Sequence, residues 1–65
     1  MRIEASITNT GNDWFWKIVT DVSVVNYPGR VGGVCDGPGE AGLQAAKAVR
    51  EISVWYWNQT QQELF

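Results

Sequence analysis

The sequence contains no histidine and only one cysteine in 65 residues, and both shortages restrict its chemistry. Histidine is the side chain that most often transfers protons near neutral pH, so its absence argues against acid-base catalysis. Cys35 has no partner for an internal disulfide, and one thiol without an imidazole does not supply the ligands of a structural zinc site. We therefore expect a cytoplasmic protein with no metal, no cofactor and no enzymatic activity.

Long apolar runs and an excess of positive charge are also missing. No apolar run approaches the roughly 18 residues that cross a bilayer, and the start Met1-Arg2-Ile3-Glu4 lacks the charged-then-apolar pattern of a signal peptide. Five basic and seven acidic residues give a net charge of -2, which is a poor match to the phosphates of nucleic acids. We expect neither secretion, nor membrane binding, nor direct nucleic-acid binding.

Tryptophan, in contrast, is abundant: Trp14, Trp16, Trp55 and Trp57 occur in a chain that is long enough for one domain, residues 1–65. Tryptophan combines a large rigid contact area with one polar group, so it is over-used in small cores and in protein interfaces. The sequence leaves open which of the four indoles are buried. The composition favours a protein that binds over one that catalyses.

Three segments have the character of β-strands. Residues 2–8 alternate polar side chains with Ile3, Ala5 and Ile7, which predicts a half-buried strand. Residues 9–13 predict a hairpin loop. Residues 14–25 are rich in aromatic and β-branched side chains, which predicts a second strand that is bent or bulged near Asp21. On this second strand Trp14, Trp16 and Ile18 share one face, and Phe15, Lys17 and Val19 share the other.

A second turn and a short third strand follow. Asn26-Tyr27-Pro28-Gly29 predicts a type II turn, because proline suits its first central position and glycine the positive φ of the next. Residues 30–35 then predict a strand, in which Gly32 and Gly33 indicate a bulge or the close approach of another backbone.

The sequence Asp36-Gly37-Pro38-Gly39-Glu40 predicts a helix start, with Pro38 at the first helical position, Gly37 as the cap and Glu40 complementing the helix dipole. A phosphate cradle is the alternative, but no Lys-Ser or Lys-Thr pair follows the glycines. The apolar stripe of the helix comprises Ala41, Ala45, Ala48 and Ile52, then Trp55 or Tyr56, with Val49 beside it. The alanines leave room for the indoles of the second strand.

We expect this helix to span roughly 18 to 20 residues, a length of about 30 Å. Residues 52–57 could instead form a fourth strand, but no turn residue separates them from the alanines, so continuation of the helix is preferred. The polar residues 58–63 are expected to fray, and the sequence leaves open whether Leu64 and Phe65 dock on the domain.

The predicted fold is α+β: a three-stranded antiparallel sheet in β-β-β-α order, with one C-terminal helix packed on one face. The uncovered sheet face would carry Phe15 and Val19, with Val25 as a further candidate. The outer side of the helix would carry Leu43, Val54 and Trp57. A contiguous apolar patch on either surface would indicate a binding site.

Two catalytic interpretations compete with simpler ones. Cys35, at a strand end before a helix start, could act as a nucleophile, but without histidine a buried unreactive thiol is favoured. Asp36 and Glu40 could form an acid-base pair, yet helix capping already explains both carboxylates.

Residues 29–50 resemble the strand-to-helix part of HicB-type antitoxins, which have a glycine-containing strand, a tight turn and an alanine-rich helix that opens with Glu-Ala. Here the corresponding features are Gly32-Gly33, Asp36-Gly37 and Glu40-Ala41. This resemblance implies an antitoxin fragment that binds a small ribonuclease toxin.

The whole chain is similar in size and style to small proteins of phages and mobile elements, including anti-CRISPR proteins of the type I systems. That resemblance implies a non-enzymatic inhibitor in the host cytoplasm that binds a CRISPR effector complex and blocks target DNA, by acidic mimicry or by steric obstruction. A monomer is favoured, and a self-associating structural module is a further alternative. The residues expected to contact the partner are Phe15, Asp21, Tyr27, Asp36, Glu40, Glu51 and Trp57.

Overall fold

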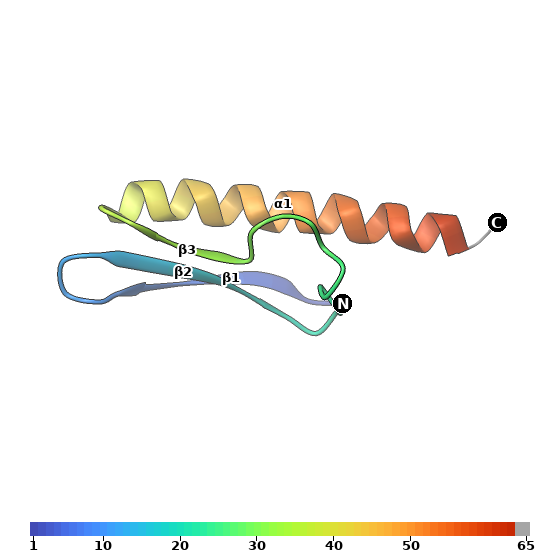
Figure 1. Cartoon of the computed structure of the whole chain (residues 1–65), viewed down its shortest axis with the longest axis horizontal. Coiled ribbons are helices and arrows are strands. Elements are labelled where there is room, and N and C mark those ends of the chain that lie inside the picture. The colour runs from blue at the N-terminus through green and yellow to red at the C-terminus, as the bar shows by residue number, and fades with distance from the viewer. Residues whose placement is uncertain (64–65) are drawn as a thin grey trace.

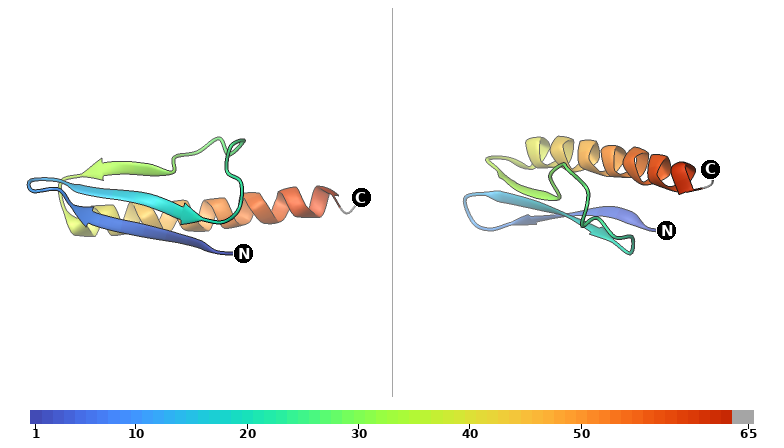
Figure 2. Two further views of the ribbon diagram at one scale, coloured as in Figure 1. Left: turned by 90° about the horizontal axis from the view of Figure 1, so that it is seen from below. Right: turned by 45° about the vertical axis from the view of Figure 1, so that its right-hand side comes forward.

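A computed structural model shows the predicted α+β fold as two layers, a sheet and one helix (Figure 1). It describes the backbone of residues 1–63 and the side chains of residues 1–60. The strands are β1 (Ile3–Asn9), β2 (Trp14–Thr20) and β3 (Gly32–Cys35), and the helix is α1 (Pro38–Glu63). The strands pair antiparallel in the order β1-β2-β3, and α1 covers one face of the sheet (Figure 2).

The loop between β1 and β2 is the predicted hairpin loop. Gly11 has a φ of 99°, in the left-handed region that favours glycine. Its N–H donates to Asn9 Oδ1 at 2.7 Å, and the N–H of Thr10 donates to the carbonyl oxygen of Asp13 at 2.9 Å. Local side-chain and backbone bonds therefore close the turn without help from the rest of the chain.

The apolar face predicted for the first strand is only partly buried. The register pairs Ile7 with Trp16 and Ala5 with Ile18, so these side chains lie on the side of the sheet that α1 covers. Ala5 is nevertheless exposed, and Ile7 retains 43% of its accessible surface. β1 is an edge strand, so these side chains have a neighbouring strand on one side only.

The second strand ends earlier than predicted, at Thr20 instead of residue 25. Thr20 Oγ1 accepts a hydrogen bond from the N–H of Val22 at 3.1 Å, and Asp21 Oδ1 accepts one from the N–H of Arg2 at 2.9 Å. These side-chain bonds offer the backbone an alternative to the sheet ladder. A loop therefore replaces the last third of the predicted strand.

This loop, residues 21–31, turns at a different place from the predicted type II turn. The N–H of Tyr27 donates to the carbonyl oxygen of Val24 at 3.0 Å, and Gly29 is not among the glycines of the described chain with positive φ. A Cβ on Gly29 would lie 2.6 Å from the hydroxyl oxygen of Tyr27. The ring of Tyr27 folds back over Gly29 and packs on Trp55 of α1, so a tertiary contact overrides the local turn preference.

The third strand is short, and its glycines permit the close approach that the sequence indicated. β3 begins at Gly32, and one further bond, from the N–H of Ile18 to the carbonyl oxygen of Val31 at 2.9 Å, extends its pairing with β2. A Cβ on Gly32 would lie 3.1 Å from the carbonyl oxygen of Trp16. A Cβ on Gly33 would lie 2.9 Å from Nε1 of the same tryptophan.

α1 begins at Pro38 as predicted, and the N–H of Ala41 donates to the carbonyl oxygen of the cap residue Gly37 at 3.2 Å. The helix has 26 residues, more than the predicted 18 to 20. Residues 52–57 are helical, so the alternative fourth strand does not form. Residues 58–63 are helical too, contrary to the expected fraying, since no glycine or proline interrupts the helix there.

The C-terminal part of α1 extends past the end of the sheet, so part of the helix has no layer beneath it (Figures 1 and 2). The question of whether Leu64 and Phe65 dock on the domain lies outside the described residues.

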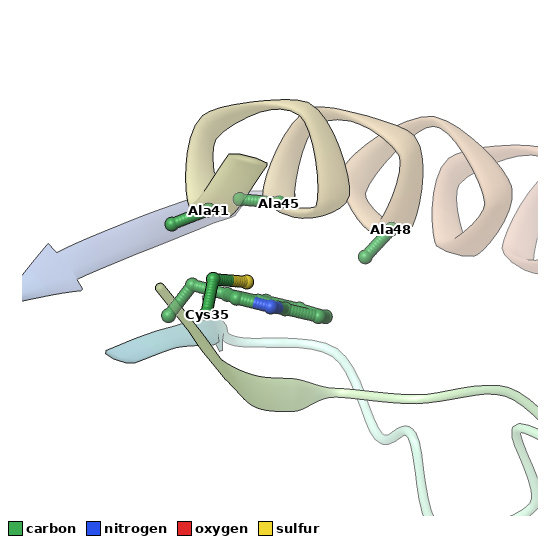
Figure 3. Close-up of a cluster of buried hydrophobic side chains, with 5 residues drawn as sticks. Cys35, Ala41, Ala45 and Ala48 are labelled. Atoms are coloured by element: carbon green, nitrogen blue, oxygen red, sulfur yellow. The ribbon is translucent and has the colours of Figure 1, made fainter. Parts of the chain in front are cut away.

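The core forms where the alanines of α1 meet β2 and β3, as the sequence predicted (Figure 3). Trp16 retains 2% of its accessible surface, and Trp14 and Ile18 pack against the same cluster. Burial of one such indole contributes about 4–6 kcal/mol before its entropic cost. The buried residues are Trp16, Cys35, Ala41, Ala45, Ala48 and Ile52.

Candidate functional site

The uncovered face of the sheet carries a small apolar group. Phe15 and Val34 are direct cross-strand partners, and Val19 lies on the same face of β2. Phe15 and Val19 are about equally exposed, at 38% and 41%. Val25, the further candidate for this face, lies instead in the loop 21–31, because β2 ends before it.

The outer side of α1 carries a longer row of exposed side chains, which we call the outer stripe: Leu43, Lys47, Arg50, Val54 and Trp57. Their spacing alternates between four and three residues, which places them on one side of the helix, away from the buried alanines. Leu43 is 75% exposed and Trp57 is 62% exposed. The prediction that Leu43, Val54 and Trp57 face outward is confirmed.

A hollow of about 280 Å³ lies beside this stripe, where the loop 21–31 meets α1. We call it the α1 groove, and its lining residues are Trp16, Arg30, Gln44, Lys47, Ala48 and Glu51. The guanidinium of Arg30 lies 5.8 Å from the centre of the Trp16 ring, a cation–π distance. The ring and the cation thus form one wall of the groove.

Gln44 holds the Trp16 indole in place. The indole Nε1–H donates to Gln44 Oε1 at 3.1 Å, and Gln44 Nε2 donates in turn to Glu40 Oε1 at 3.3 Å. Gln44 is half-buried, although it lies outside the apolar stripe predicted for the helix. The signal that could have revealed this role is its position one residue before Ala45, beside the apolar stripe.

Tyr27 and Glu51 connect the loop to the helix at the same place. The Tyr27 hydroxyl donates to Glu51 Oε2 at 3.4 Å, and the Tyr27 ring meets Trp55 edge-on with centroids 5.4 Å apart. Burial raises the pKa of Tyr27, and the Glu51 carboxylate adds to the shift. Lys47 Nζ lies 4.0 Å from Glu51 Oε1, so this carboxylate has two neighbours already.

A second, shallow depression adjoins the α1 groove along the helix, and the two share Lys47 and Glu51. Its other lining residues are Arg50, Val54, Trp55 and Asn58. The cations Arg30, Lys47 and Arg50 and the apolar side chains of Ala48, Val54 and Trp55 therefore line adjoining hollows on one side of α1.

The residues expected to contact a partner do not gather in one place. Phe15 lies on the uncovered sheet face, Asp21 lies at the end of β2, and Trp57 lies on the outer stripe. Asp36 and Glu40 flank the start of α1. Only Tyr27 and Glu51 are joined by a hydrogen bond, at the α1 groove. Sequence reasoning missed Arg30, Lys47 and Arg50 as candidates.

The catalytic alternatives find no geometric support. Cys35 is buried, and burial raises the pKa of its thiol, with a further contribution from the Glu40 carboxylate. Among the described side chains, those of residues 1–60, no three Asp, Glu or Cys residues gather closely enough to hold a metal ion. The helix of the described chain is not apolar enough to cross a membrane.

The structure thus defines a two-layer α+β protein whose most exposed apolar helix residues follow one line along α1. No protein-family model, curated protein or solved structure matches the chain.

Proposed function

We propose that the chain is a non-enzymatic inhibitor that binds a host defence complex, the activity implied by its similarity to small anti-CRISPR proteins of the type I systems. The observation that carries the proposal is the outer stripe of α1. Trp57 and Val54 lie one helical turn apart on it, and Leu43 lies nearer the start of the helix. Lys47 and Arg50 occupy the stripe between Leu43 and Val54. Apolar side chains aligned on one helix face are used by helices that dock into a groove of a partner.

The exposed indole is the strongest single element of this surface. Trp57 exposes 62% of its surface to solvent and is not a member of the buried core cluster. Tryptophan is enriched among the few interface residues that dominate binding energy. Isolated apolar residues on a surface need no explanation, but a line of three on one helix face supports a docking role.

Steric obstruction is the mode of inhibition that the charge distribution favours. Mimicry of DNA would need carboxylates along one surface, whereas Asp21 and Asp36 lie at the ends of different strands and Glu51 lies beside Lys47 and Arg50. A helix of about 39 Å, from 26 residues, is long enough to cover a functional surface of a larger complex.

Affinity capture with the full chain as bait tests this proposal. Wild-type protein and a Trp57→Ala bait are incubated with lysate from a bacterium that has a type I CRISPR system, and the retained subunits are quantified by mass spectrometry. Val25→Ala is the matched control, because Val25 is 87% exposed and lies in the loop 21–31, outside the outer stripe. We expect effector subunits on the wild-type and control baits and at least a ~10-fold loss on Trp57→Ala.

Absence of effector subunits from the wild-type bait would contradict the inhibitor proposal. Equal recovery by wild type and Trp57→Ala would contradict the role of the outer stripe while leaving inhibition in place.

A HicB-like antitoxin is the second candidate, and one observation favours it. Residues 29–50 form a glycine-containing strand, a tight turn and an alanine-rich helix, the local arrangement that the resemblance implied. This candidate predicts that the same capture experiment recovers a small ribonuclease toxin in place of CRISPR effector subunits.

A further inference from the structure

The positive charges of the molecule are concentrated on one side of α1. The chain has five basic residues and a net charge of -2. Three of the five, Arg30, Lys47 and Arg50, line the α1 groove or the depression that adjoins it. Glu51 is the single acidic residue in either lining. A local cationic surface therefore exists on a protein that is acidic as a whole.

These cations are only weakly neutralised by the chain itself. Among the described side chains, neither Arg30 nor Arg50 has a carboxylate oxygen within 4.0 Å. Lys47 reaches Glu51 only at 4.0 Å, and Glu51 also accepts a hydrogen bond from Tyr27. Exposed pairs of this kind contribute little and leave the cations free to meet another anion.

Apolar surface lies between the cations. Ala48 and the ring of Trp16 line the groove, and Val54 and Trp55 line the depression. Trp16 and Ala48 are almost fully buried, so the apolar surface that a ligand can reach belongs mainly to Val54, which is 54% exposed, and to the half-buried Trp55. The surface is therefore suited to a ligand that combines carboxylates with at least one apolar side chain.

We propose that the α1 groove and its adjoining depression bind an acidic segment of a partner protein, with carboxylates against Arg30, Lys47 and Arg50 and an apolar side chain between them. This inference rests on the proposed function, because it assigns a partner chemistry to the binding side of α1. Such charge complementarity sets orientation and speeds association.

Two other occupants fit the surface less well. A second copy of the chain would bring the same cations, and an antiparallel pair of helices centred on Arg50 would place like charges opposite each other. A nucleic acid would also meet the cations, but the net charge of -2 opposes it at longer range.

Selection from a displayed library of random peptides tests the proposal without a host complex. The full chain is the target, and the affinity of enriched peptides is measured by fluorescence polarisation. We expect the enriched sequences to be rich in Asp and Glu around an aromatic or aliphatic residue. We expect Lys47→Glu/Arg50→Glu to weaken their binding at least ~10-fold.

The matched control is Arg2→Glu/Lys17→Glu, which changes the net charge by the same amount at sites outside the groove. It should change the dissociation constant less than about twofold. If circular dichroism shows loss of helix in Lys47→Glu/Arg50→Glu, the neutral variant Lys47→Gln/Arg50→Gln replaces it with the same expected direction.

Three results would overturn the proposal: no enriched peptide, enriched peptides without acidic residues, or equal weakening in both charge variants. A single-stranded oligonucleotide that binds more tightly than the peptides would assign the surface to nucleic acid instead. Because the selection uses purified protein alone, its failure is separate from a failure to capture the effector complex.

Discussion

At the scale of single residues, Trp16 shows how the core and the candidate site depend on each other. Its ring fills the space above the alanines of α1, and its edge forms the wall of the α1 groove. Arg30 lies over the ring and Gln44 accepts its N–H, so a change in the core would also change the groove.

Loss of the Gln44 hydrogen bond should therefore lower stability measurably. We expect Gln44→Ala to reduce the free energy of unfolding in urea by about 0.5–1.5 kcal/mol, because the part-buried indole N–H loses its acceptor. Gln59→Ala, at an exposed position of the same helix, should stay within about 0.5 kcal/mol of wild type. Equal stability of the two variants would show that water replaces the acceptor without cost.

Alkaline pH should destabilise the fold through two residues. Burial raises the pKa of both Cys35 and Tyr27 above their ordinary values of 9.0 and 10.0. The folded state therefore holds these protons more tightly than the unfolded state, so the stabilisation is complete below about pH 9 and is lost as pH rises through the folded-state pKa values. Urea unfolding from about pH 7 to about pH 11 should show this decline.

The contribution of the thiol can be separated from that of the phenol. Cys35→Ala should remove the part of the decline in unfolding free energy that begins near the ordinary thiol pKa of 9.0. Tyr27→Phe should remove the part that begins near the ordinary phenol pKa of 10.0. A free energy of unfolding that stays constant or rises over this pH range would contradict the assignment.

At the scale of elements, the sequence predicted the features that local interactions determine. Residues 9–13 close a hairpin with their own hydrogen bonds, and Pro38 starts α1 because its missing N–H costs nothing there. The buried stripe of α1 also followed from helical periodicity alone.

The sequence did not predict the features that depend on contacts between residues far apart in the chain. Asp21 binds the N–H of Arg2 across the sheet and ends β2, and Tyr27 reaches Trp55 and displaces the predicted turn. The exposed residues of the outer stripe could be found from periodicity. The α1 groove could not, because Arg30 reaches the helix from a loop whose course no local pattern specifies.

Replacement of a glycine by alanine should have opposite effects on stability in β3 and in α1. Gly33→Ala should lower the free energy of unfolding by about 1–3 kcal/mol, because its Cβ would press on Trp16 Nε1 at 2.9 Å and on the guanidinium of Arg30. Gly42→Ala should raise it by about 0.5–1 kcal/mol, because a Cβ there meets nothing within 4 Å and alanine favours helix. Thermal unfolding of both variants checks the two signs, and stabilisation by Gly33→Ala would contradict the close packing of β3 on Trp16.

At the scale of the whole molecule, the shape is elongated, with extents of 48 × 17 × 17 Å along its principal axes. The outer stripe follows the long axis because α1 does (Figure 1). A small core under one half of a long helix leaves the rest of that helix available for contacts with another molecule.

The charges on the outer stripe should keep the molecule monomeric. Lys47 and Arg50 lie at its centre, so two stripes facing each other would bring like charges together. Multi-angle light scattering across a range of concentrations should give the mass of one chain, 7.3 kDa. A mass that rises with concentration toward that of a dimer would favour the self-associating module.

A DNA-binding assay with a purified type I CRISPR effector complex, titrated with the full chain and with Trp57→Ala and Val25→Ala, tests whether the chain is an inhibitor. The inhibitor proposal predicts that wild type and Val25→Ala abolish binding of target DNA near stoichiometric amounts, and that Trp57→Ala needs at least ~10-fold more protein. DNA binding that stays unchanged at saturating wild-type protein would contradict it.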